Sequence, residues 1–125
     1  MQELNRLLQT LCDAEIEFVV VGGFAAMLHG SSMLTRDLDV CAVLTDASVA
    51  SLRTDLGPLD VLGSVSGFDD IAEIRRNAVS FELFGRSVLV MSRDDLIRSK
   101  EALGRPKDLL VAQELRAVSE KLGKQ

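Results

Sequence analysis

Residues 19–40, VVVGGFAAMLHGSSMLTRDLDV, decide how this chain folds. The apolar run 18–21 predicts a short strand inside a covered sheet, because strands buried on both faces are apolar throughout. Gly22 and Gly23 end that strand, and 24–28 is helical in pattern. A second strand is predicted over 38–44, with Asp37 and Asp39 at its start. The stretch therefore predicts a strand–helix–strand unit that presents two carboxylates.

The rest of the chain predicts a single α/β (α+β) domain over residues 1–125, with a small mixed sheet flanked by helices. Apolar residues at i, i+3, i+4 and i+7 predict an amphipathic helix over 2–14. A strand is predicted over 59–65, and a hairpin over 78–83 and 87–91 around Gly85. Ser92 followed by Asp95 predicts a capped helix that ends near residue 102. Further helices are predicted over 47–53, 69–77 and 107–122, the last after Pro106 and with a stripe of Leu109, Leu110, Ala112, Gln113 and Leu115.

The composition excludes several classes of protein. The chain has 125 residues, of which 47% are hydrophobic and 4% aromatic, so aliphatic side chains must build its core. No apolar run approaches the roughly 20 residues that a membrane span needs, and the N-terminus lacks the features of a signal peptide. Cys12 and Cys41 are too few for a disulfide framework and are expected to be buried. These features favour a cytoplasmic location.

The charge is unevenly distributed. Residues 1–85 carry 5 basic and 13 acidic side chains, whereas residues 86–125 carry 9 and 6. The acidic part argues against a general nucleic-acid binder, which would show a basic face. The division suits a metal site that faces an anionic ligand, although ordinary variation between two solvated surfaces would give the same numbers.

The two acids at the start of the second strand are candidate metal ligands. Asp37 and Asp39 are two residues apart on a strand, so their carboxylates share a face. They repel each other and are costly to desolvate, and a cation offsets both costs. Hard oxygen ligands suit Mg²⁺ or Mn²⁺. Asp60, an isolated acid in an apolar strand, is the candidate third ligand; alternatively the pair arises by chance and Asp60 faces water.

Glycines and basic residues are the candidate phosphate ligands. Gly22 and Gly23 would let backbone N–H groups approach a triphosphate, although a tight strand-to-helix turn also explains them. They form neither a Walker A motif nor a GxGxxG fingerprint. The candidate cations, which as an alternative are solvated helix ends, are Arg36, Lys100, Arg105 and Lys107. His29, the only histidine, is expected to play a structural part at a helix end.

Taken in order, these motifs resemble the nucleotidyltransferase superfamily of the polymerase-beta type. They are the glycine pair with its Ala-rich helix, the segment TRDLDV, and the tail DLIRSKEALGRPKDLL over 95–110. The resemblance covers roughly residues 15–118. Within the superfamily the chain is similar to minimal nucleotidyltransferase-like bacterial proteins, which include toxin–antitoxin components and relatives of antibiotic-modifying enzymes.

The resemblance implies a role for each motif. Gly22 and Gly23 would hold the phosphates, Asp37 and Asp39 the metal ions, and Asp60 would complete the metal site and deprotonate the acceptor hydroxyl. Gly23 stands where many members carry serine, and the link from Val40 to Asp60 is short for the group.

Two functions follow from these residues. The first, which the intact set of acids favours, is a metal-dependent enzyme that moves NMP from an NTP to a hydroxyl of an antibiotic, a protein or an RNA end. The second is a catalytically weak or inactive nucleotidyltransferase-fold binding protein, such as a toxin–antitoxin component. The short link and the lack of a segment for the acceptor favour this second function. For the transfer reaction, a homodimer or a partner protein is expected to supply the acceptor side.

Overall fold

The computed structural model of this chain describes residues 2–13, 15–35, 37–42, 59–62 and 65–123. Two of the sequence predictions, the basic residue Arg36 and the helix over 47–53, lie outside these ranges. For Asp60 the backbone is described and the side chain is not.

A mixed β-sheet forms the centre of the described part, as the sequence predicts. Its strands are β1 (Phe18–Val21), β2 (Leu38–Ala42), β3 (Leu59–Leu62), β4 (Val79–Leu83) and β5 (Arg86–Val90), in the order β3-β2-β1-β5-β4. The central strand β1 pairs antiparallel with β2 and parallel with β5. The outer pairs are β2 with β3, which is parallel, and β4 with β5, which is the predicted hairpin.

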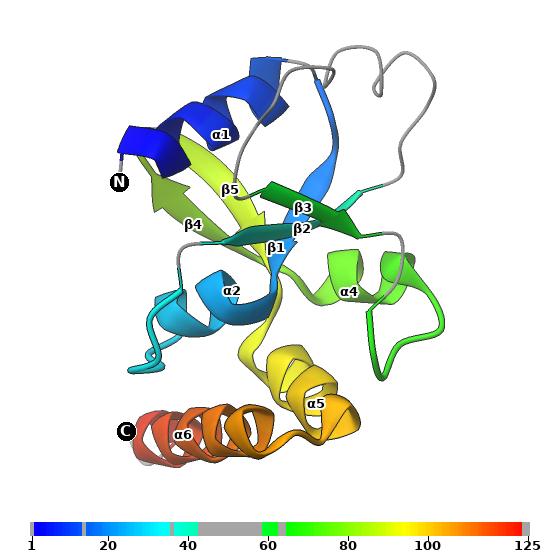
Figure 1. The fold of residues 1–125 in the computed structure, drawn as a ribbon, viewed down its shortest axis with the longest axis vertical. Helices are drawn as coiled ribbons and strands as arrows, with labels where there is room; N and C mark the ends of the chain where they lie inside the picture. The colour runs from blue at the N-terminus through cyan, green and yellow to red at the C-terminus, as the bar shows by residue number, and fades with distance from the viewer. Residues whose placement is uncertain (1, 14, 36, 43–58, 63–64, 124–125) are drawn as a thin grey trace.

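Helices cover both sides of this sheet (Figure 1). They are α1 (Gln2–Asp13), α2 (Gly22–Leu28), α4 (Ile71–Asn77), α5 (Arg93–Leu103) and α6 (Pro106–Gly123). Figure 1 shows α1 on one side of the sheet and α2 and α4 on the other, with the α5–α6 pair beyond them. Among the helices in the described ranges, none has both the length and the apolar character needed to cross a membrane.

Aliphatic side chains build the core, as the low aromatic content requires. Leu8 and Leu11 of α1 and Val20 and Val90 of the sheet are all inaccessible to solvent. Cys41 is also buried, and this burial, with a smaller effect from the charge of Asp39, raises the pKa of its thiol to about 11. Cys12 is only half-buried, so the expectation that both cysteines are buried is wrong for Cys12.

The sequence signals at the ends of the helices act as expected, with one difference. Ser92 Oγ accepts a hydrogen bond from the backbone N–H of Asp95 at 3.2 Å and so caps α5. Gly104 ends this helix with a left-handed φ of 70°, and Pro106 begins α6. The difference is at α2, which begins at Gly22 itself, so the two glycines form the first turn of the helix and not a break before it.

The predicted apolar stripe of α6 is wrong in part. Leu109 and Leu110 are 48% and 58% exposed. The residues of α6 that are buried are Asp108, Val111, Ala112 and Leu115. This set has the helical spacing i, i+3, i+4 and i+7, and sequence reasoning missed it because its first member is charged.

Candidate functional site

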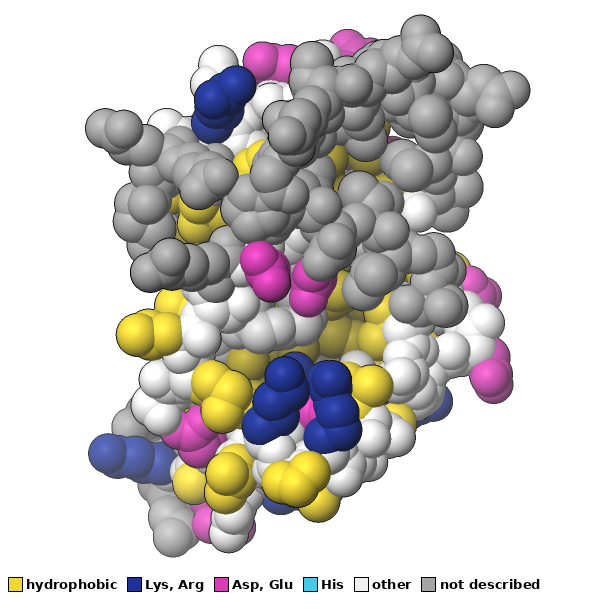
Figure 2. Space-filling view, in the orientation of Figure 1, with side chains coloured by type: hydrophobic (Ala, Val, Ile, Leu, Met, Phe, Trp, Pro, Cys, Tyr) yellow, Lys and Arg dark blue, Asp and Glu magenta, His cyan; other side chains and the backbone are white. Residues whose placement is uncertain are grey.

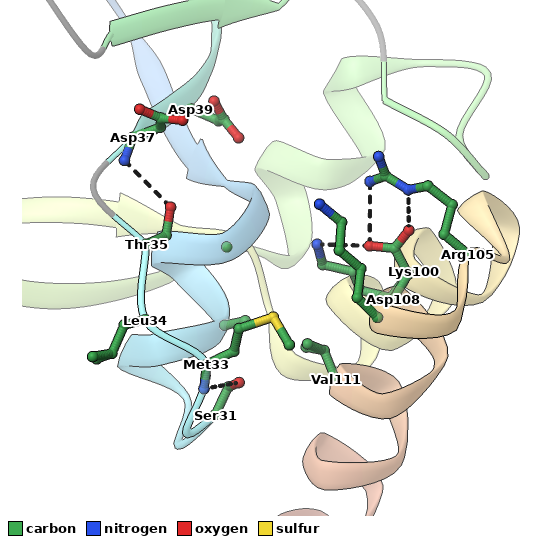
Figure 3. Close-up of a pocket in the computed structure, with 13 residues that line it drawn as sticks. Ser31, Met33, Leu34, Thr35, Asp37, Asp39, Lys100, Arg105, Asp108 and Val111 are labelled. Atoms are coloured by element: carbon green, nitrogen blue, oxygen red, sulfur yellow. Dashed lines mark hydrogen bonds and ion pairs between the residues drawn. The ribbon is translucent and has the colours of Figure 1, made fainter.

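A pocket of about 240 Å³ opens between the start of β2 and the α5–α6 pair. Figure 2 shows acidic side chains on one side of this hollow and basic side chains on the other. The residues that line it are Gly23, Ala26, Ser31, Met33, Leu34, Thr35, Asp37, Asp39, Lys100, Arg105, Lys107, Asp108 and Val111. The close-up in Figure 3 shows the acids Asp37 and Asp39 facing the basic residues of α5 and α6.

Strand β2 positions the acidic wall. Leu38 and Val40 are buried in the core, so the alternation of the strand turns Asp39, which is half-buried, towards the pocket. The backbone of Asp39 pairs with Val21 of β1 on one side and with Asp60 of β3 on the other.

Asp37 is exposed just before the strand, and its backbone N–H donates to Thr35 Oγ1 at 3.3 Å. Hydrogen bonds of the backbone therefore fix the main-chain positions from which both carboxylate side chains extend.

The first glycine makes room for one of these carboxylates. Gly22 has a φ of +69°, and a Cβ atom at this position would lie 2.6 Å from Oδ2 of Asp39. Any other residue would both strain the backbone and displace the carboxylate. A Cβ at Gly23 would lie 3.3 Å from Cγ2 of Thr35, and Gly23 itself lines the pocket. Gly22 thus has a structural reason for being glycine that does not depend on a phosphate.

A buried acid organises the basic wall. The side chain of Asp108 is 1% exposed, and its Oδ1 lies 3.3 Å from Nζ of Lys100. Its Oδ2 accepts from Nε of Arg105 at 2.5 Å, and Nη2 of Arg105 lies 3.4 Å from Oδ1. Burial by itself raises the pKa of the Asp108 carboxyl, but the hydrogen bonds and charges of Arg105 and Lys100 outweigh burial, so this pKa lies below its ordinary value.

The charges of the described lining residues cancel. The three negative charges of Asp37, Asp39 and Asp108 balance the three positive charges of Lys100, Arg105 and Lys107. No group of three His, Cys, Asp or Glu side chains suited to a metal ion occurs in the described ranges. Two carboxylates in one pocket still fit Mg²⁺ or Mn²⁺, because Mg²⁺ commonly takes one or two carboxylates together with the phosphates of a substrate.

The segment before the acidic wall is tied to the helices opposite. Glu114 of α6 accepts hydrogen bonds from Ser31 Oγ at 3.0 Å and from Ser32 Oγ at 2.5 Å. The hydrogen bond from the Ser32 hydroxyl is the largest cause that lowers the pKa of Glu114.

At the end of α2, His29 Nε2 donates to the carbonyl of Met91 at 2.8 Å, and burial lowers the pKa of the His29 ring. His29 therefore stands at the end of α2 as expected, but its side chain contacts Met91 instead of the end of that helix, and its burial disfavours the protonated form.

The structure brings together six of the residues predicted from the sequence, namely Gly23, Asp37, Asp39, Lys100, Arg105 and Lys107. Gly22 lies directly behind Asp39 without lining the pocket. Asp60 is placed by its backbone beside Asp39 in the sheet. Asp108 is not among the site residues predicted from the sequence. The available signal was its position three residues after Arg105, which is within ion-pair reach at the start of a helix.

Comparison with known proteins identifies the family. A family model described as "Nucleotidyltransferase of unknown function (DUF6036)" matches residues 1–119. Among solved structures, the chain is similar to an antigenic nucleotidyltransferase-like protein from Paracoccidioides brasiliensis, with 15% sequence identity and a TM-score of 0.53. That match covers 90% of this chain and 71% of the other and shows a shared fold. No curated protein matches the sequence. With the match over residues 1–119, the predicted resemblance is confirmed: this chain belongs to a family of nucleotidyltransferases whose function is unknown.

Proposed function

We propose that this protein binds a nucleoside triphosphate with Mg²⁺ or Mn²⁺ in the pocket and transfers the nucleotide to a hydroxyl acceptor. The observation that carries the proposal is the pocket itself, in which Asp37 and Asp39 oppose Lys100, Arg105 and Lys107. A metal–triphosphate complex has the complementary division of charge, because its metal cations would face the carboxylates and its phosphate oxygens would face the basic side chains.

Charge balance explains why the metal is needed. The described lining residues have equal numbers of positive and negative charges, so they do not neutralise a triphosphate. A triphosphate has about four negative charges, and two divalent cations held by carboxylates match that number. Asp37 and Asp39 would hold the metal, with Asp60 as the third candidate ligand. The metal would supply charge stabilisation at the phosphorus that is attacked.

The basic wall supplies the other half of the binding. Lys107 is exposed at the pocket, and Arg105 is 56% exposed although it pairs with Asp108. Guanidinium and ammonium groups bind phosphate oxygens through charge-assisted hydrogen bonds. Lys100 is more enclosed, at 13% exposure, and its position depends on Asp108.

The transfer itself would form a bond between the acceptor oxygen and the α-phosphorus and break the bond between that phosphorus and the bridging oxygen to the β-phosphate. Pyrophosphate leaves with the bonding electrons. The hydroxyl proton goes to a base, for which the resemblance implies Asp60. The pair Lys100 and Arg105 would stabilise charge on the leaving pyrophosphate.

Calorimetric titration with each of the four NTPs, with and without Mg²⁺, tests the proposal. We expect binding of at least one NTP that requires Mg²⁺. Asp37→Asn is the informative variant, because Asp37 is exposed and its loss spares the core. We expect it to weaken the Mg²⁺-dependent affinity at least tenfold, which is about 1.4 kcal/mol.

The matched control is Asp13→Asn, the same chemical change at an exposed acid of α1 that does not line the pocket. This variant should bind as the unmodified protein does. Absence of binding to every NTP would overturn the proposal and favour a binding protein without nucleotide chemistry. Equal losses in the two variants would show a general charge effect and no metal site.

A further inference from the structure

The pocket has an apolar end that neither the carboxylates nor the cations explain. Ala26 of α2 and Val111 of α6 line it and are 1% and 3% exposed. Met33, which follows α2, lines the same end and is 41% exposed. Figure 3 shows the Met33 side chain extending towards Val111, on the far side of the pocket from Asp37. An exposed methionine over two buried apolar residues leaves a surface suited to a flat apolar group.

Hydrogen bonds hold the segment around Met33, at the apolar end of the pocket, in place. Glu114 accepts from Ser31 Oγ, from Ser32 Oγ and, at 3.2 Å, from the backbone N–H of Ser32. Ser31 Oγ in turn accepts from the backbone N–H of Met33 at 3.2 Å. The hydroxyl of Ser31 is therefore already engaged as donor and as acceptor. What this end of the pocket offers a ligand is mainly the side chain of Met33, because Ala26 and Val111 are almost inaccessible to solvent.

The proposed function leaves one part of the substrate without a binding surface. Its phosphates are expected between the carboxylates and the cations, so the sugar and the base must extend elsewhere along the pocket. A nucleobase has apolar faces and polar edges, and methionine sulfur makes favourable contacts with aromatic rings. On the basis of the proposed function, we infer that the apolar end formed by Ala26, Met33 and Val111 receives the nucleobase of the bound nucleotide.

Inorganic tripolyphosphate tests this inference because it has the phosphates and no base. In the presence of Mg²⁺, the NTP that binds most tightly should bind more tightly than tripolyphosphate. Met33→Ser should weaken binding of that NTP about tenfold, because it removes the apolar contact, and should change tripolyphosphate affinity by less than about twofold. Circular dichroism and thermal unfolding would confirm that the variant folds.

Leu109→Ser is the matched control, because Leu109 is 48% exposed on α6 and does not line the pocket. It should leave both affinities unchanged. If Met33→Ser weakens the binding of neither ligand, or of both equally, the base does not contact the apolar end. The inference is then wrong while the proposed function stands. If no NTP and no tripolyphosphate binds with Mg²⁺, both the proposed function and the inference fail.

Discussion

The two walls of the pocket are built on different principles. On the acidic wall, Asp39 is fixed by backbone pairing with β1 and β3. On the basic wall, Lys100 and Arg105 belong to the α5–α6 pair and are gathered by one buried side chain, Asp108. Sheet register tolerates a change of side chain, whereas an ion-pair cluster does not. Among the residues that line the pocket, we therefore expect Asp108 to be the most sensitive to substitution.

The largest effect is expected for Asp108→Ala. This change leaves the ammonium of Lys100, which is 13% exposed, without its partner. Removing one member of a buried ion pair typically costs about 3 kcal/mol or more, and chemical denaturation would measure the lost free energy of unfolding. Asp94→Ala, at an exposed acid in the first turn of α5, is the control and should cost below about 1 kcal/mol.

A double variant sharpens this result. Lys100→Met in the Asp108→Ala background removes the unpaired ammonium, so it should recover part of the lost stability. If Lys100→Met instead adds a further loss of similar size, Asp108 does not organise the basic wall through Lys100.

An intermediate effect is expected on the acidic wall for Gly22→Ala. The left-handed φ costs an alanine about 1–2 kcal/mol, and the new Cβ also meets the Asp39 carboxylate. Gly85→Ala is the matched control, because Gly85 has a φ of +79° and nothing within 4 Å of the added Cβ. Thermal unfolding of both variants would isolate the contribution of the carboxylate. Equal losses at the two glycines would show that Asp39 moves aside freely and that the acidic wall is not fixed by close packing.

The smallest effect is expected for a contact between the residue that follows α2 and the residues that precede α5. His29 follows α2, and its Nε2 donates to the carbonyl of Met91, which precedes α5. Loss of such a hydrogen bond in His29→Leu should cost about 1 kcal/mol at pH 7.5. Stability measured by denaturation at pH 7.5 and 5.5 would also report the titration of the ring.

The sign of this pH dependence follows from the lowered pKa. Burial lowers the pKa of His29 in the folded protein, so the unfolded chain binds the proton first. The stability that neutral His29 contributes is therefore full above about pH 6.5 and is lost as the pH falls from there through the folded pKa. The chain has 1 histidine, so His29→Leu should remove this dependence between pH 7.5 and 5.5. A variant that keeps the same slope would assign it to other groups.

The fold was largely predictable because its signals are local. Alternation in β2, the apolar spacing in α1, the Ser92 cap and the Gly104–Pro106 boundary each depend on residues within a few positions of one another. The failure at α6 has the opposite cause. Asp108 points inward only because Lys100, on another helix, and Arg105 neutralise it there. A pattern that counts apolar residues therefore assigned Leu109 and Leu110 to the buried face.

By itself, the sequence determined the strand–helix–strand unit and the family to which the chain belongs. It also predicted that Asp37 and Asp39 lie together, and both line the pocket, although Asp37 lies just before β2 and not within it. The tertiary structure decided what faces them. The contact between Ser31 and Glu114 spans 83 positions and that between His29 and Met91 spans 62. Contacts of that range depend on how the helices pack against the sheet, and no local periodicity encodes them.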